Sequence, residues 1–230
     1  MKAFKTLVSG IFAGVLIGCG AIAFLLCRIY LNNPVLGAFI FGIGLFLICL
    51  LGLFLYTGQI GFIIGKKHKK QFVIELLLML LGNLVGAFLI GLVFRSGVRL
   101  DNNWEFVNRM KEFTDAKVVT FADGGRNILT LLSFSSVCGA FVYLGVYLFK
   151  KENLHPLLKT VGLFACVAIF VMSGFEHSIA LVAYLALGWQ LIDMIGFALL
   201  SILIAIIGNS LGAILVALAL DFLQNHKVSE

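Results

Sequence analysis

The stretch "VMSGFEHSIALV", residues 171–182, places the ionisable pair Glu176 and His177 in an otherwise apolar segment. The nearest other charged side chains are those of Lys159 and Asp193. The segment between them is long enough to cross the hydrocarbon core of a membrane, which takes about 20 helical residues. Because ionisable groups at mid-membrane are costly, they mark functional sites by default. The stretch therefore predicts a membrane crossing that is interrupted at its centre by a functional pair.

Composition places the whole chain in the membrane class. Of its 230 residues, 61% are hydrophobic and 12% are charged, and the mean hydropathy is +1.10. These values lie far outside the usage of soluble globular proteins. The formal net charge of +6 says little about partners, because most of it falls on one side of the predicted membrane. We expect contact with membrane lipid and no nucleic-acid partner.

Uncharged runs of membrane-spanning length recur along the chain. The run at 29–65 is too long for one ordinary crossing, so it is predicted to hold a broken one, as is the segment 157–192. The chain therefore has six predicted crossings, and its fold class is an all-α integral membrane protein. The uncharged runs are 6–27, 29–65, 76–94, 127–149 and 194–220.

Basic residues orient these crossings. With six crossings both termini lie on one side, and all the basic residues predicted on that side are lysines, including four in the run "KKHKK" at 66–70. By the positive-inside rule that side is cytoplasmic. We interpret 66–70 as a topology anchor rather than a nucleic-acid or lipid-headgroup site. We expect a multi-pass protein of the plasma membrane with both termini in the cytoplasm.

The N-terminal segment "MKAFKTLVSGIFAGVLIGC" also fits a lipoprotein signal with Cys19 as the acylated residue. Its apolar run continues to Cys27 and carries small residues near helical spacing, which favours a close-packed first membrane helix. The five cysteines lie in apolar runs without ligand spacing, so we interpret them as packing residues. In the absence of nucleotide, metalloprotease or nucleophile-elbow motifs, we expect no cofactor, no metal and no enzyme activity.

Two similar segments indicate an internal repeat. "GNLVGAFLIGLV" at 82–93 and "GNSLGAILVALA" at 208–219 both lie in the last crossing of their half. Halves of three crossings are related by an inverted repeat, and paired breaks in their second crossings point to a translocation site. The breaks are predicted near 55–61 and 173–178. We predict one transmembrane channel domain, 1–230, with repeat one at about 6–94, a polar outer connection at 95–126 and repeat two at about 127–222.

The motifs together resemble one family. "SGFEHSIA" (173–180), with "GNLVGA", "GNSLGA", "LYTGQ" (55–59) and "SGIFAG" (9–14), resembles the formate/nitrite transporter family of channels. The similarity covers nearly the whole chain in the right order. It implies an aquaporin-like protomer of six helices with an inverted repeat and broken second and fifth helices. It also implies a homopentamer with one pore in each protomer, in the cell inner membrane of a prokaryote.

The resemblance implies roles for polar residues. His177 matches the central pore histidine, Thr57 the loop threonine that faces it, and Lys117 a vestibule lysine that attracts anions. The family's Cys-Asn-Trp in the fourth crossing is replaced by "SFSSVCG", residues 133–139. Ser133 or Phe134 thus stands where the family has asparagine, so the substrate is not transferable from any one member.

The resemblance also implies two apolar constrictions, an outer one of Leu55 and Phe170 and an inner one of Leu45 and Val137. On a continuous helix Glu176 would point about 100° away from its neighbour His177. We therefore expect it to pair with freed backbone or a neighbouring protomer and not to line the same path. The residues expected to support the pore structurally are Glu176, Gly58, Gly174, Asn83 and Asn209.

The predicted function is a channel or transporter for small monovalent anions of weak acids, namely formate, nitrite or hydrosulfide. Because an isolated charge is costly between apolar constrictions, the anion is expected to cross with a proton. Either His177 donates that proton, or the falling dielectric raises the anion's proton affinity so that water supplies it. The residues fit both a passive channel and proton-coupled transport.

Two other classes of function stay open. One is an intramembrane enzyme that uses His177 and Glu176 as acid and base. The other is a structural or lipid-anchored membrane protein, for which matched helix breaks would have no purpose. Flux of a labelled substrate without its turnover distinguishes transport from both.

Overall fold

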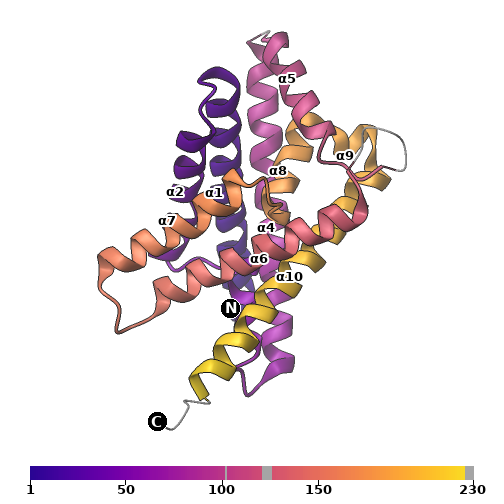
Figure 1. The fold of residues 1–230 in the computed structure, drawn as a ribbon. Helices are drawn as coiled ribbons and strands as arrows, with labels where there is room; N and C mark the ends of the chain where they lie inside the picture. The colour runs from indigo at the N-terminus through magenta and orange to yellow at the C-terminus, as the bar shows by residue number, and fades with distance from the viewer. Residues whose placement is uncertain (102, 121–125, 226–230) are drawn as a thin grey trace.

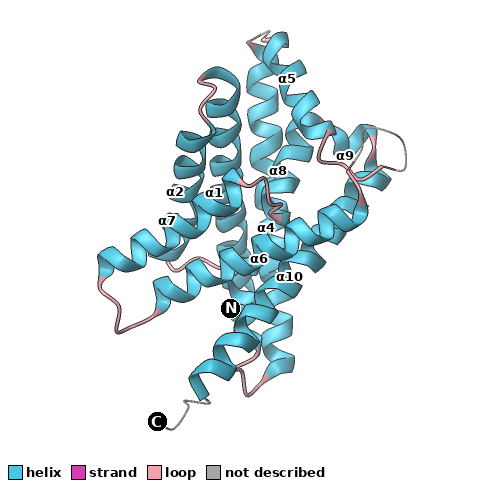
Figure 2. Ribbon diagram, in the orientation of Figure 1, coloured by secondary structure: helices cyan, strands magenta, loops and turns pink. Residues whose placement is uncertain are grey.

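A computed structural model describes residues 1–101, 103–120 and 126–225, and nearly all of the ordered elements in these ranges are helices (Figure 1, Figure 2). The elements are α1 (Lys2–Tyr30), α2 (Pro34–Leu50), α3 (Tyr56–Gln59), the 3-10 helix η1 (Ile60–Ile63), α4 (Lys69–Leu100), α5 (Trp104–Asp115), α6 (Ile128–Lys150), α7 (Pro156–Met172), α8 (Ser178–Gly188), α9 (Gln190–Asp193) and α10 (Ile195–Asn225).

Four of these helices are long and apolar enough to cross a membrane, namely α1, α4, α6 and α10. Helices α1 and α4 contain their predicted uncharged runs and extend past them at both ends, whereas α6 and α10 begin one residue into theirs and extend past the other end. The added turns carry residues such as Lys2 and Arg99, whose long side chains keep their charge near water while the helix continues. Helix α1 continues without interruption through Cys19, as a first membrane helix would.

The other two predicted crossings are broken. One consists of α2 and the short α3–η1 segment, and the other of α7 and α8. The first break covers 51–55, earlier than the predicted 55–61, because residues 56–63 form short helical turns of their own. Each break contains a glycine in the left-handed region, Gly52 with φ +65° and Gly174 with φ +71°. A residue with a Cβ atom adopts this conformation only at a cost.

Close helix contacts recur in both halves of the chain. Helix α1 packs along α4, and α6 packs along α10. A Cβ atom added at Gly14 would overlap the backbone carbonyl of Asn83, and one added at Gly139 would overlap that of Asn209. The small residues thus let two helix backbones touch, which is how membrane helices gain packing energy. The two Gly-Asn segments seen in the sequence are part of these two contacts.

The polar connection contains a helix, α5, that its sequence pattern did not predict. Helix α5 begins after Asn103, whose side chain accepts a hydrogen bond from the Phe106 backbone N–H. Phe106, Val107 and Met110 are buried, and α5 contacts α8. Figure 1 shows α5 and the α1–α2 turn at the top of the view and the end of α10 at the bottom. Helix α8 is buried along its whole length, and α5 packs against it from above in this view.

Candidate functional site

The break before α8 is held by one asparagine from α10. Asn209 Oδ1 accepts a hydrogen bond of 2.8 Å from the Ser178 backbone N–H. Its Nδ2 donates to the carbonyl oxygens of Glu176, at 2.9 Å, and Ser135, at 2.8 Å. Backbone groups that an interrupted helix leaves open are thus satisfied inside the protein. His177 lies between the two bonded residues, so its position is fixed.

The break before α3 is held in the same way from α4. Asn83 Oδ1 accepts a hydrogen bond of 2.8 Å from the Tyr56 backbone N–H. Its Nδ2 donates to the carbonyl oxygens of Phe54, at 2.9 Å, and Gly10, at 2.8 Å. Leu55 lies between the bonded residues, as His177 does in the other break. Leu55 and His177 therefore occupy corresponding positions, each at the N-terminal cap of a half-helix.

The two breaks meet at a hydrogen bond between side chains. Thr57 Oγ1 and His177 Nε2 lie 2.8 Å apart, and both residues are buried. His177 Nδ1 accepts from the Ala180 backbone N–H at 3.3 Å, which caps α8. An accepting Nδ1 carries no proton, so Nε2 carries it and donates to Thr57. The geometry thus presents His177 as a neutral hydrogen-bond donor.

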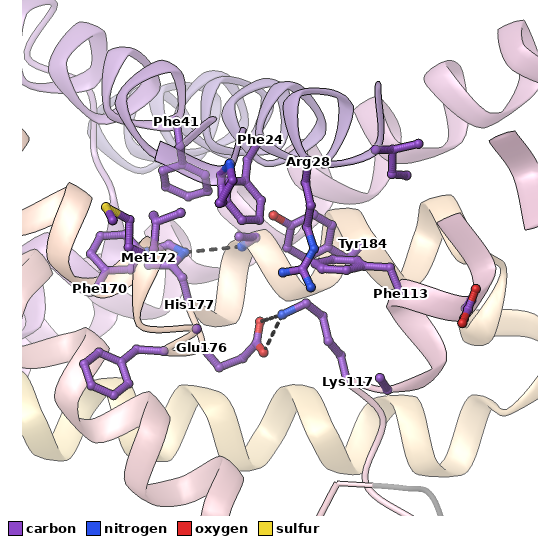
Figure 3. A pocket seen from close by; sticks show the side chains of 18 of the residues that line it. Phe24, Arg28, Phe41, Phe113, Lys117, Phe170, Met172, Glu176, His177 and Tyr184 are labelled. Atoms are coloured by element: carbon purple, nitrogen blue, oxygen red, sulfur yellow. Dashed lines mark hydrogen bonds and ion pairs between the residues drawn. The ribbon is translucent and has the colours of Figure 1, made fainter. Parts of the chain in front are cut away.

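His177 lies in the wall of a cavity that we call the vestibule. The vestibule has a volume of about 850 Å³ and lies on the α5 side of the protomer. Its wall includes Phe170, whose ring centre lies 6.2 Å from that of His177. Figure 3 shows both side chains beside the same space. The charged residues that line the vestibule are Arg28, Arg109, Glu112, Lys117, Arg126 and Glu176.

Glu176 forms a cluster of three charges in the vestibule wall. Lys117 Nζ donates to both carboxylate oxygens, at 2.8 and 3.1 Å, as Figure 3 shows, and Arg126 donates to Oε2. The side chains of Glu176, Lys117 and Arg126 are 2%, 13% and 17% exposed. Two cations around one carboxylate leave a formal charge of +1, so the cluster attracts anions.

The structure differs from two expectations for Glu176. Its carboxylate pairs with Lys117 and Arg126, whereas the freed backbone pairs with Asn209. It also lines the same cavity as His177. The helical angle between neighbours does not apply here, because His177 has an extended backbone, with φ −94° and ψ 118°.

Aromatic rings and a further cation surround the charge cluster. Lys117 Nζ lies 5.0 Å from the ring centre of Phe113 and 5.1 Å from that of Tyr184. The Arg28 guanidinium lies 5.3 Å from the Phe113 ring centre, and Figure 3 shows Arg28 reaching from α1 towards the same space. Arg126 lies over the ring of Phe134, which stands at the place of the family's asparagine or beside it. These faces stabilise the cations without neutralising them.

A second, smaller cavity lies at the opposite end of the protomer, and we call it the basal cavity. Its volume is about 160 Å³, and its wall is mainly apolar and includes Leu55. Gly58 also lines it, and a Cβ atom there would lie 2.8 Å from a methyl carbon of Val146. At the end of α6, Lys150 Nζ donates a 3.1 Å hydrogen bond to Gln59 Oε1. The Thr57–His177 pair connects the half-helices that border the two cavities.

The structure does not bring all predicted constriction residues together. Phe170 lines the vestibule and Leu55 the basal cavity, so they do not share one cavity. Leu45 is buried in the apolar core. Val137 is 38% exposed and lines neither cavity. It lies one helical turn from exposed Ser133, on a different face of α6 from its buried residues, so the structure gives no support to its predicted place in the path.

Several residues of the site were assigned no individual role from the sequence. Arg28, Arg126 and Lys150 were predicted only as basic residues near the crossings, and Gln59 only as part of the motif "LYTGQ". The common signal of the three charged residues is position, since each lies directly beside the end of a predicted crossing, whereas Gln59 lies in the predicted first break. Within the described ranges, no three His, Cys, Asp or Glu side chains gather to hold a metal ion.

The sequence is similar to those of known transport proteins. A family model described as "Formate/nitrite transporter" matches residues 1–222. Nitrite transporter NirC of Escherichia coli (strain K12) is 27% identical over 195 residues, covering 79% of this chain and 68% of that protein. NirC of Salmonella typhimurium (strain LT2) is also 27% identical and is covered to 67%.

Solved structures share the fold. One described as a pentameric formate channel with formate bound superposes with a TM-score of 0.79 at 20% identity, covering 98% of each chain. A second, described as an FNT family ion channel, gives a TM-score of 0.69 at 22% identity, covering 96% of this chain and 88% of the other. The arrangement of helices is thus common to all three proteins.

Proposed function

The chain belongs to the formate/nitrite transporter family, and from this premise we propose that it is a membrane channel for small monovalent anions of weak acids. Formate, nitrite and hydrosulfide are the expected substrates. The observation that carries the proposal is the buried Thr57–His177 hydrogen bond between a cationic vestibule and an apolar basal cavity. It provides a polar contact at the point where the path is otherwise apolar.

The charge cluster accounts for the first step of permeation. Lys117 alone would be neutralised by Glu176, whereas Arg126 adds the excess positive charge. With Arg28 on the opposite wall, the vestibule concentrates anions by electrostatic attraction. Because the cations are only partly buried, a bound anion still exchanges with solvent.

Crossing the apolar region requires removal of the charge. An unpaired ion in a low-dielectric site is costly, and protonation removes most of that cost. His177 caps α8 through Nδ1, and protonation of Nδ1 would break this cap and place a cation at the positive end of the helix dipole. We infer that water in the vestibule supplies the proton and that His177 donates a hydrogen bond to the passing acid.

The remaining features of the proposal concern assembly and orientation. We propose a homopentamer with one pore in each protomer, in the inner membrane of a prokaryote, with both termini in the cytoplasm. The vestibule then opens to the outside and the basal cavity to the cytoplasm. The matching contacts of Asn83 and Asn209 support an inverted repeat of 6–94 and 127–222. Matched helix breaks serve a translocation site, whereas they would have no purpose in a merely structural membrane protein.

Reconstitution tests the proposed function. Purified protein in liposomes should carry labelled formate or nitrite down its gradient, and the substrate should be recovered chemically unchanged. In a correctly assembled His177→Phe protein we expect flux at least about tenfold below wild type, because the hydrogen-bond donor at the narrow region is lost. Wild-type flux in this variant would remove the assigned role of His177. Chemical conversion of the substrate would favour the intramembrane enzyme.

A further inference from the structure

The basal cavity contains a lysine that the pathway described above does not use. Lys150 is the last residue of α6 and lines this cavity with Gln59 and Leu55. Its ammonium group donates to Gln59 Oε1 at 3.1 Å and lies 4.7 Å from the ring centre of Phe62. The side chain is thus held at the mouth of the cavity by α3 and η1, where it stays exposed to solvent.

The charge of Lys150 is not balanced locally. Among the described residues Lys150 has no carboxylate within ion-pair distance, whereas Lys117 in the vestibule is paired with Glu176. A neutral amide leaves the full positive charge of the ammonium group in place. The remaining wall is mainly apolar and includes Ile48 and Val146, so few groups compete for an anion there.

We propose that Lys150 and Gln59 form a second anion-binding site, at the cytoplasmic mouth of the pore, for small monovalent anions such as formate and nitrite. The ammonium group has three donors and keeps two after its bond to Gln59. A cavity of about 160 Å³ has room for an ion of a few atoms next to the lysine. This site rests on the proposed function, since it raises the anion concentration at the inner end of the same path.

Lys150 also has a simpler explanation as an anchor. A lysine at a helix C-terminus interacts favourably with the helix dipole and favours a cytoplasmic location. The neighbouring Lys151 offers the same charge at the same helix end and is exposed as Lys150 is, but it is absent from the wall of the basal cavity. Lys150→Gln and Lys151→Gln therefore change the topology signal equally, but only the first changes the cavity.

Uptake into oriented membrane vesicles tests the site. In inside-out vesicles, where the basal cavity faces the medium, Lys150→Gln should raise the half-saturation concentration for labelled formate about three- to tenfold, as expected for loss of a screened charge. In right-side-out vesicles the initial uptake rate at low formate should stay near that of wild type. Lys151→Gln should behave like wild type in both. Lys150→Arg, which keeps the charge, should retain most of the affinity and confirms that the position tolerates substitution.

A substitution at Gln59 neutralises the site without removing the lysine. Gln59→Glu places a carboxylate next to Lys150, so the pair becomes neutral while the lysine signal at the end of α6 is kept. We expect the same rise in half-saturation concentration as for Lys150→Gln. Unchanged affinity in both Lys150→Gln and Gln59→Glu proteins that still assemble would overturn the site. If wild-type protein carries no anion in either vesicle type, the proposed function fails as well, whereas normal wild-type flux confines the failure to this site.

Discussion

The two helix breaks have nearly the same backbone support but different residues at their centres. In each, an asparagine from the last long helix of its half bonds the residues before and after the cap position. In each, a left-handed glycine, Gly52 or Gly174, lies three residues before that position. The residue at the cap is Leu55 in the first break and His177 in the second.

This difference separates the structural part of the site from its chemical part. The asparagines and glycines satisfy and bend the backbone in both halves, so they explain why broken crossings are stable. Only the second break carries ionisable side chains, and its Glu176 organises the vestibule cations. The first break supplies an apolar cap residue at the basal cavity, and helix α3, which follows it, supplies Thr57, which bonds His177. A symmetric scaffold therefore holds an asymmetric path.

The largest expected effect tests the shared scaffold. Asn83→Ala and Asn209→Ala each leave several buried backbone groups unsatisfied, at a cost of about 3 kcal/mol or more in unfolding free energy. Denaturation in detergent should show similar losses for both variants. Asn127→Ala, which removes an exposed cap of α6, should cost only about 1 kcal/mol. A large loss in one asparagine variant and none in the other would break the equivalence of the two breaks.

The next effect tests the residues at the cap positions. His177→Leu makes the second break resemble the first and should lower formate flux about tenfold or more relative to His177→Asn, because asparagine keeps a cap and a donor. Initial uptake rates in proteoliposomes with equal protein content give the comparison. Equal flux in the two variants would mean that the donor at this position is not what the path requires.

A smaller effect tests the net charge of the vestibule. Arg126→Gln leaves Lys117 and Glu176 as a neutral pair, so we expect uptake from the vestibule side to need about threefold more anion for half-saturation. Arg109→Gln is the control, since Arg109 lies at the same cavity but pairs with Glu105 near solvent. An equal shift in both variants would assign the effect to general surface charge.

The smallest expected effect concerns the source of the proton. Uptake from the vestibule side should increase as the pH there falls, because more of the permeating acid is neutral. If water supplies the proton, His177→Asn should lower the rate without changing its dependence on pH between about 6 and 8. A flat pH profile in His177→Asn would instead identify His177 as the proton donor.

Much of the fold follows from the sequence, because hydropathy and glycine placement act locally. The uncharged runs predicted the four long helices, and "SGFEHS" marked the second break at the correct residues. The first break was displaced, since "LYTGQIG" forms short helical turns that its composition does not distinguish from irregular chain. Helix α5 was missed because its buried residues are covered by α8, a contact between segments far apart in the chain.

By itself, the sequence determined that the chain is a membrane protein, that two crossings are broken, and that the ionisable pair Glu176 and His177 lies in one of the breaks. These properties depend on the cost of charges and open backbone groups in lipid, which a single segment reveals. Only the tertiary structure decided the partners: Asn209 on the freed backbone, Arg126 on Glu176 and Gln59 on Lys150. Each pair joins residues at least 33 positions apart, and such contacts are fixed by helix packing rather than by local pattern.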